Sequence, residues 1–184
     1  MAHTGDHQTR LIVLRGNSGS GKTSTAKALR ARLGRGTALV EQDYLRRIVL
    51  KEHDIADGAN IGLISQTTRY ALNHGYDVIL EGILSAARYG DMLNTLRHDH
   101  IGESSFYYFE ISFAETLRRH ATRPQASQFG VEEMRGWYRE HDLLDFTDER
   151  LVHETSSLDE TVNRILTQVY GAHPIPAIQP TTLR

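Results

Sequence analysis

The sequence contains no cysteine, which excludes disulfide bonds and metal sites built from thiolates. It also has no apolar run long enough to span a bilayer, so we expect no membrane partner. Residues 1–8 are polar and lack the apolar core of a signal peptide. From these absences we expect a cytoplasmic protein.

An excess of charge of one sign is missing as well. The formal net charge is −2 at pH 7, so the chain as a whole does not attract nucleic acid or anionic membranes, although a local basic groove is compatible with it. The ten histidines form no tight ligand pattern, and we interpret them as surface or capping residues. At 184 residues, the chain is long enough for one domain with a sizeable core.

The most informative stretch is residues 16–23, which read GNSGSGKT and match the phosphate-binding P-loop pattern G-x-x-x-x-G-K-[ST]. The apolar run at 11–14 indicates a buried strand before it, and the run at 23–33 indicates a helix after it. Glycines let such a loop wrap closely around an oxyanion, and the helix N-terminus adds positive potential. The predicted phosphate site comprises Gly16, Asn17, Ser18, Gly19, Ser20, Gly21, Lys22, Thr23 and Ser24.

Two side chains of this motif carry specific chemistry. The Lys22 ammonium is expected to reach the β- and γ-phosphates, and the Thr23 hydroxyl is expected to be a ligand of Mg²⁺. The alternative is a Gly/Ser-rich turn with an unrelated lysine, which the flanking strand and helix disfavour.

Strand patterns alternate with helix patterns along the chain. We predict strands at 11–14, 37–41, 77–81, 105–111 and 151–154, and helices at 23–33, 44–51, 61–73, 85–97, 113–123, 131–144 and 158–170. This alternation predicts an α/β fold with a parallel, doubly wound sheet covered on both faces. We expect residues 1–9 to be loose, residues 10–170 to form the domain, and residues 171–184 to be an extended tail.

Ligands of such sheets bind at the carboxyl ends of the strands, which draws attention to Asp43. Its carboxylate could orient a substrate hydroxyl or accept its proton, whereas the alternative is an N-cap of the following helix. Arg46 lies three residues later and can face the same cleft. For Arg46 and Arg47 a solvated basic face is the alternative.

Glu81 ends an apolar strand, at the position of a carboxylate that holds Mg²⁺ beside a P-loop. Aspartate is commoner at this position, and an exposed strand terminus is the alternative interpretation. With Thr23, Glu81 is our candidate for the metal site.

Arg119 and Arg123 lie four residues apart on one helical face, next to Pro124 and a polar stretch. Such a pair could form a lid that neutralises phosphate charge and excludes water. The alternative is a basic helix surface with an ion pair from Glu115 to Arg119. We expect Trp137, farther along, to serve packing.

Together, the P-loop, DYLR at 43–46, VILEG at 78–82 and the Arg119/Arg123 pair resemble small P-loop kinases over about residues 10–170. The most similar are the chloramphenicol phosphotransferase, zeta-toxin and polynucleotide kinase group within the adenylate-kinase-like class. The resemblance implies a three-layer fold with five parallel strands in the order 2-3-1-4-5 and a helical lid at about 119–140. It also implies ATP and Mg²⁺ as cofactors, with adenine near 155–158.

By the same resemblance, Asp43 matches the hydroxyl-activating aspartate, and Arg46 matches an arginine that holds phosphate or substrate. We therefore expect an ATP-dependent kinase acting on a hydroxyl of a small molecule, with Lys22, Asp43, Arg119 and Arg123 as catalytic residues. The acceptor is not inherited, because members phosphorylate antibiotics, nucleotide sugars and nucleic acid ends.

Two alternatives stay open. The first is a 5′-hydroxyl polynucleotide or nucleoside kinase, against which the acidic balance argues mildly. The second is a regulatory ATPase without an acceptor. A guanine-binding Asn-Lys-x-Asp sequence is absent, which disfavours a GTPase.

Overall fold

The computed structural model describes residues 3–121 and 130–171. Five strands form one parallel sheet in the order β2-β3-β1-β4-β5. The strands are β1 (Arg10–Gly16), β2 (Thr37–Glu41), β3 (Asp77–Gly82), β4 (Glu103–Glu110) and β5 (Arg150–His153). The helices are α1 (Lys22–Leu33), η1 (Tyr44–Val49), α2 (Ala59–Asn73), α3 (Ala86–Asp99), α4 (Phe113–His120), α5 (Val131–Trp137) and α6 (Leu158–Tyr170).

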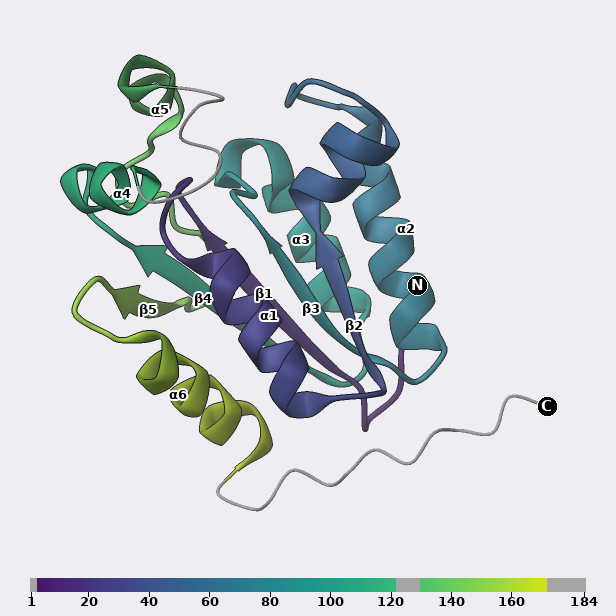
Figure 1. The fold of residues 1–184 in the computed structure, drawn as a ribbon. Coiled ribbons are helices and arrows are strands. Elements are labelled where there is room, and N and C mark those ends of the chain that lie inside the picture. Colours follow the sequence, from purple (N-terminus) through teal and green to yellow (C-terminus); the bar gives the residue numbers. More distant parts are fainter. Residues whose placement is uncertain (1–2, 122–129, 172–184) are drawn as a thin grey trace.

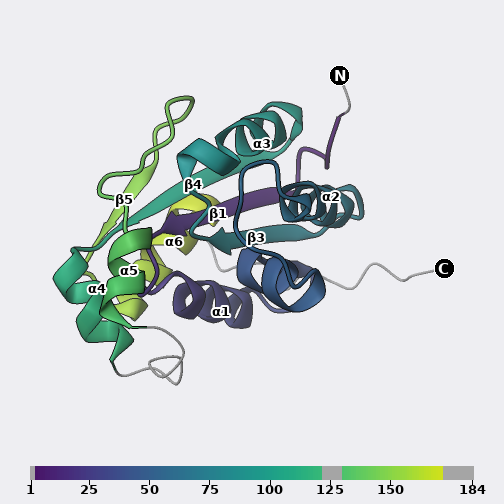
Figure 2. The same cartoon turned by 90° about the horizontal axis from the view of Figure 1, so that it is seen from above.

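The sheet is buried on both faces because the side chains of each strand alternate between two cores. In β1, Ile12 and Leu14 pack with α1 and α6, whereas Leu11 and Val13 pack with α2 and α3. Helices therefore cover the two faces of the sheet as outer layers (Figures 1 and 2). The predicted three-layer α/β fold and its strand order are confirmed.

Three segments differ from the sequence-based expectation. The helix predicted at 131–144 ends at Trp137, and Tyr138 is already extended. The segment after β2 is a π-helix rather than an α-helix. Residues 3–9 were expected to be loose, but Thr4 forms an isolated β-bridge with His100 at the end of α3. Both residues are buried.

The elements that shape the site stand at the carboxyl ends of the strands. The pair α4 and α5 rises on one side of β1, and the blue segment that contains η1 rises on the other (Figures 1 and 2). The P-loop lies at this edge because it directly follows β1. None of the helices within 3–121 and 130–171 is long and apolar enough to cross a membrane.

Candidate active site

The P-loop adopts a backbone that requires its glycines. Gly16, Gly19 and Gly21 have φ angles of 138°, 85° and 104°, in the region that side chains disfavour. A Cβ on Gly16 would also lie 2.8 Å from the Phe109 carbonyl oxygen, and one on Gly19 would lie 2.8 Å from that of Thr116. The loop is therefore held closely against the end of β4 and against α4.

Lys22 is the first residue of α1 and is buried, with 6% of its surface exposed. Its Nζ donates hydrogen bonds to the Asn17 carbonyl at 2.8 Å and to Ser20 Oγ at 3.2 Å. No side chain caps the N-terminus of α1, and no acidic residue lies in its first turn. The helix thus presents backbone amides and a lysine to the loop interior, as a phosphate site requires.

Thr23 and Glu81 meet at the loop, as a shared metal site requires. The Thr23 hydroxyl donates to Glu81 Oε1 at 3.0 Å. Glu81 is buried, which raises the pKa of its carboxyl against the opposing influence of the Lys22 charge. These oxygen donors suit Mg²⁺, which is usually held by one or two protein groups together with phosphates and water. Within 3–121 and 130–171, no cluster of three or more acidic or histidine ligands offers an all-protein metal cage.

Asp43 and Arg46 form an ion pair at the end of β2. Arg46 Nη2 lies 2.8 Å from Asp43 Oδ1, and the Asp43 side chain is 61% exposed. Asp43 is the N-cap residue of η1, as the alternative interpretation predicts, but its side chain makes no capping hydrogen bond to the helix. Its carboxylate is thus free of the helix backbone and available to a ligand.

A cavity of about 850 Å³ connects the P-loop with Asp43. Its wall comprises Ser18 of the P-loop, residues between 43 and 54, residues between 83 and 88, and residues between 133 and 142. The cavity is large enough for a small ligand. A molecule bound there would lie between Asp43 and the phosphate loop.

Arg119 extends from α4 to the P-loop. It donates to the Ser20 carbonyl at 2.9 Å, to Glu115 Oε1 at 2.6 Å and to the Glu154 carbonyl at 3.2 Å. Hydrogen bonds from Arg118 and Arg119 lower the pKa of Glu115 to about 2. The ion pair with Glu115 that the alternative interpretation predicts is present, and the same guanidinium contacts the P-loop. Its role in a lid stays a prediction.

Other residues of the predicted lid are placed only in part. Arg123 lies outside the described residues. Trp137, for which we expected a packing role, is 46% exposed and lines the large cavity. Its neighbour Tyr138 does pack, since its hydroxyl donates to the Ile111 carbonyl at 3.0 Å.

The predicted adenine region borders a second cavity of about 350 Å³. This cavity reaches Glu154 and Ser112, although residues 155–158 do not line it. Ser157 is engaged in capping α6, because it exchanges hydrogen bonds with Glu160. The adenine assignment to 155–158 stays a prediction.

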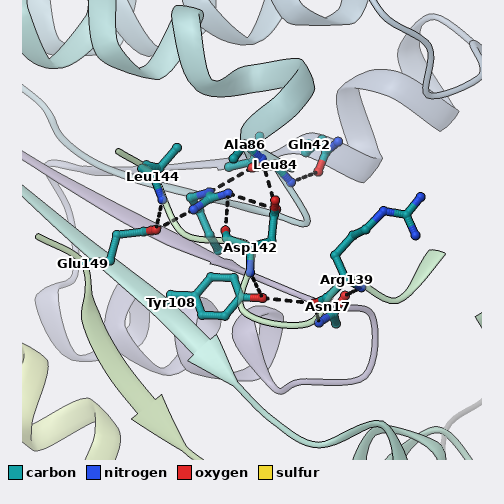
Figure 3. A network of polar contacts seen from close by, with 10 residues as sticks. Asn17, Gln42, Leu84, Ala86, Tyr108, Arg139, Asp142, Leu144 and Glu149 are labelled. Carbon is teal, nitrogen blue, oxygen red and sulfur yellow. Dashed lines mark hydrogen bonds and ion pairs between the residues drawn. The ribbon is translucent and has the colours of Figure 1, made fainter. Parts of the chain in front are cut away.

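Asn17 joins the P-loop to the chain that follows α5, which sequence reasoning missed. Its Oδ1 accepts a hydrogen bond from the Arg139 amide at 2.8 Å, and its Nδ2 donates to the Arg139 carbonyl at 2.7 Å. Tyr108 supports the same carbonyl with its hydroxyl at 3.3 Å (Figure 3). The second P-loop position thus fixes one wall of the large cavity.

Arg15, directly before the P-loop, is a fully buried cation. It pairs with Glu149 at 2.6 Å and with Asp142 at 3.2 Å, and it donates to the Leu84 carbonyl at 2.8 Å. Asp142 also accepts the amide of Ala86 at the start of α3 (Figure 3). A charged residue at the end of an apolar strand was the signal that could have identified this network.

Comparisons with known proteins identify the family and the fold of this chain. A family model described as an AAA domain, AAA_33, matches residues 11–141. The structure resembles APS kinase from Mycobacterium tuberculosis, solved with AMPPNP and APS, with a TM-score of 0.66 and 16% identity over 87% of this chain and 96% of that one. A search of curated proteins by sequence found no match.

Two further solved structures show the same fold. A sugar kinase from Janibacter sp. HTCC2649 has a TM-score of 0.65 and 16% identity, covering 89% of this chain and 97% of that one. A gluconokinase from Sinorhizobium meliloti has a TM-score of 0.57 and 18% identity, covering 92% and 93%. At these identities the likeness establishes the shared architecture.

Proposed function

We propose that this chain, which belongs to the AAA_33 family of AAA domains, is an ATP-dependent kinase that transfers the γ-phosphoryl group to a hydroxyl of a small molecule. The resemblance to small P-loop kinases is confirmed at the level of family and fold. One observation carries the proposal of transfer. Asp43 and the P-loop residue Ser18 line the same cavity, so a hydroxyl beside Asp43 would face phosphates held by the loop.

In the proposed reaction, the acceptor oxygen forms a bond to the γ-phosphorus, and the bond from that phosphorus to the β–γ bridging oxygen breaks. ADP leaves with the electron pair, and the proton of the hydroxyl passes to Asp43 and then to solvent. Arg46, 2.8 Å from Asp43, orients the carboxylate. Asp43 is the proposed base because its side chain makes no capping hydrogen bond to the helix backbone.

Charge neutralisation is the second part of the proposal. Lys22 and the amides at the start of α1 face the phosphates, and Arg119 adds a guanidinium beside the Ser20 carbonyl. Thr23 and Glu81 would hold Mg²⁺, which supplies further neutralisation of phosphate charge when bound. We retain Arg123 as a proposed lid residue.

The two alternatives differ in how well the cavity supports them. A regulatory ATPase does not need a cavity of about 850 Å³ that leads from the phosphate loop to an aspartate. A 5′-hydroxyl polynucleotide kinase is the second candidate, because this cavity also carries basic side chains such as Arg47 and Lys51. We favour a small acceptor because the chain as a whole, with a formal net charge of −2, does not attract nucleic acid.

The test is transfer from ATP across a panel of nucleosides, nucleotide sugars, hydroxylated antibiotics and 5′-hydroxyl oligonucleotides, with products read by mass. Lys22→Ala serves as the blank. Lys27→Ala, on an exposed side chain of the same helix, serves as the matched control. We expect wild type and Lys27→Ala to add one phosphate to one acceptor class, and Lys22→Ala to add none. ATP binding without transfer to any acceptor would contradict it.

A further inference from the structure

In the cavity beside Asp43, every acidic side chain is engaged by a neighbour, whereas several basic side chains have no carboxylate partner within the described residues. Its wall carries five basic side chains, namely Arg46, Arg47, Lys51, Arg88 and Arg139. It also carries five acidic ones, namely Asp43, Glu52, Asp54, Glu133 and Asp142. If every charge were paired within the wall, the cavity would have no preference for a charged ligand.

Three of the acidic side chains are paired with arginines. Asp43 pairs with Arg46 at 2.8 Å, and Asp54 pairs with Arg88 at 2.9 Å. Asp142 pairs with the buried Arg15 at 3.2 Å, outside the group of five cavity cations. These carboxylates are therefore already neutralised by neighbours.

The other two carboxylates are engaged with the backbone at helix starts. Glu52 accepts the amides of Ala59 and Asn60 at 3.0 and 2.9 Å, at the N-terminus of α2. Glu133 accepts the Gly130 amide at 3.0 Å, at the start of α5. A helix N-terminus stabilises a carboxylate, so neither acid needs a cation from the wall.

Three cations remain without a carboxylate. Within residues 3–121 and 130–171, the side chains of Arg47 and Lys51 make no hydrogen bond or ion pair. Among the residues that the structure describes, the Arg139 guanidinium donates only to the carbonyls of Gly136 and Tyr138, both at 3.0 Å. Figure 3 shows its backbone against Asn17 and its side chain extending away from the network drawn.

These three cations approach the cavity from two separate segments. Arg47 and Lys51 follow β2, as Asp43 does, whereas Arg139 follows α5 on the lid side and has its backbone fixed by Asn17. Guanidinium and ammonium groups with no acid beside them attract an anion, and arginine binds carboxylate, sulfate and phosphate in a defined geometry.

We propose that the acceptor carries an anionic oxygen group, namely a carboxylate, sulfate or phosphate, in addition to its hydroxyl. Arg47, Lys51 and Arg139 bind that group, while the hydroxyl lies at Asp43. This inference rests on the proposed kinase function, because only a kinase has an acceptor. The anion subsite itself is testable by binding alone.

Trp137 provides the measurement, because it is the chain's single tryptophan and lines this cavity. We would follow its fluorescence, and the thermal midpoint in parallel, with saturating AMPPNP and Mg²⁺. The probes are gluconate against glucose, adenosine 5′-phosphate against adenosine, and inorganic sulfate. The anionic member of each pair should bind about tenfold more tightly than the neutral member.

The variants are Arg47→Gln, Lys51→Gln and Arg139→Gln, each expected to weaken the anionic probe severalfold, up to about tenfold, and to leave the neutral probe unchanged. Arg97→Gln removes an exposed cation near the distant end of α3 and should match wild type. Equal binding of anionic and neutral probes, or no response to any anion, would overturn the proposal. Variants that weaken only AMPPNP would also overturn it.

Failure of the kinase assay has a different signature. If the anionic probes bind with the expected dependence on Arg47, Lys51 and Arg139, but nothing is phosphorylated, the anion subsite stands and the proposed transfer fails. If neutral acceptors are phosphorylated and the three variants behave as wild type, the kinase stands and the anion subsite fails.

Discussion

The side-chain amide of Asn17 pairs with the backbone of Arg139 through two hydrogen bonds, of 2.8 and 2.7 Å. The two residues are 122 positions apart, and one belongs to the phosphate loop while the other belongs to the lid segment. This pairing ties the wall that carries Arg139 to the loop that surrounds the phosphates.

Asn17→Ala should release this wall. Both bonds are lost, and the Arg139 carbonyl keeps only the weaker bond from Tyr108. We expect a loss of about 1–3 kcal/mol in the free energy of unfolding and faster hydrogen exchange at the Arg139 amide. Ser18→Ala, one position away in the same loop, is the control. If the hydrogen-exchange rate of the Arg139 amide is the same in Asn17→Ala as in wild type, the two hydrogen bonds do not fix the Arg139 backbone.

Glu81→Gln should separate stability from activity. Burial raises the pKa of Glu81, so the folded chain binds a proton there more tightly than the unfolded chain does. The stabilising contribution of this protonation is full at low pH and is lost as the pH rises through the raised pKa. At neutral pH the variant, which carries no charge to bury, should therefore be more stable than wild type without metal.

The measurements for Glu81→Gln are thermal unfolding at several pH values and the Mg²⁺ requirement of transfer. The gain in stability should vanish below 4.5, the ordinary pKa of glutamate, and Mg²⁺ with nucleotide should stabilise wild type more than the variant. Glu41→Gln, on the neighbouring strand at the same register, is the control. An unchanged Mg²⁺ requirement would remove Glu81 from the metal site.

Asp43→Asn should lower phosphoryl transfer by more than tenfold and leave ATP affinity unchanged. The amide cannot accept the proton of the hydroxyl, although it keeps the shape of the carboxylate. Because the pair with Arg46 is largely exposed on the Asp43 side, stability should change little. Asp54→Asn, another acid of the same cavity, is the control. Single-turnover transfer at the wild-type rate would exclude Asp43 as the base.

Arg119→Gln should lower the transfer rate by about tenfold or more, because a guanidinium beside the P-loop is lost. Arg118→Gln is a close control. Both arginines bind Glu115, but the Arg118 side chain is 72% exposed, whereas Arg119 also donates to the Ser20 carbonyl of the loop. The comparison is made at saturating ATP. Equal rates for the two variants would place Arg119 outside the catalytic machinery.

The sequence predicts those parts of the fold and site that depend on local patterns. The P-loop and all five strands are readable because glycine spacing and apolar runs are short-range signals. The Thr23–Glu81 contact follows from strand ends meeting at one edge of the sheet. The strand order came from the family resemblance rather than from the residues themselves.

The remaining errors concern contacts between distant segments. The apolar Leu143 and Leu144 continue a helical spacing, but the chain leaves the helix after Trp137, because Asn17 binds the Arg139 backbone and His141 has a φ of 51°. Such a partner cannot be read from periodicity. The sequence likewise does not show which cations of the cavity lack a carboxylate partner, because this depends on which acids are already bound by other groups in the folded chain.

The buried Arg15 bears on how this protein could be re-engineered. Its two carboxylate partners, Asp142 and Glu149, belong to the same segment that supplies the lid-side wall of the cavity. A designer who grafts that segment from a relative in order to change the acceptor must transfer both carboxylates with it. A graft without them would leave the buried Arg15 guanidinium without a carboxylate partner. The chimera would then fail to fold, and its acceptor specificity could not be assayed.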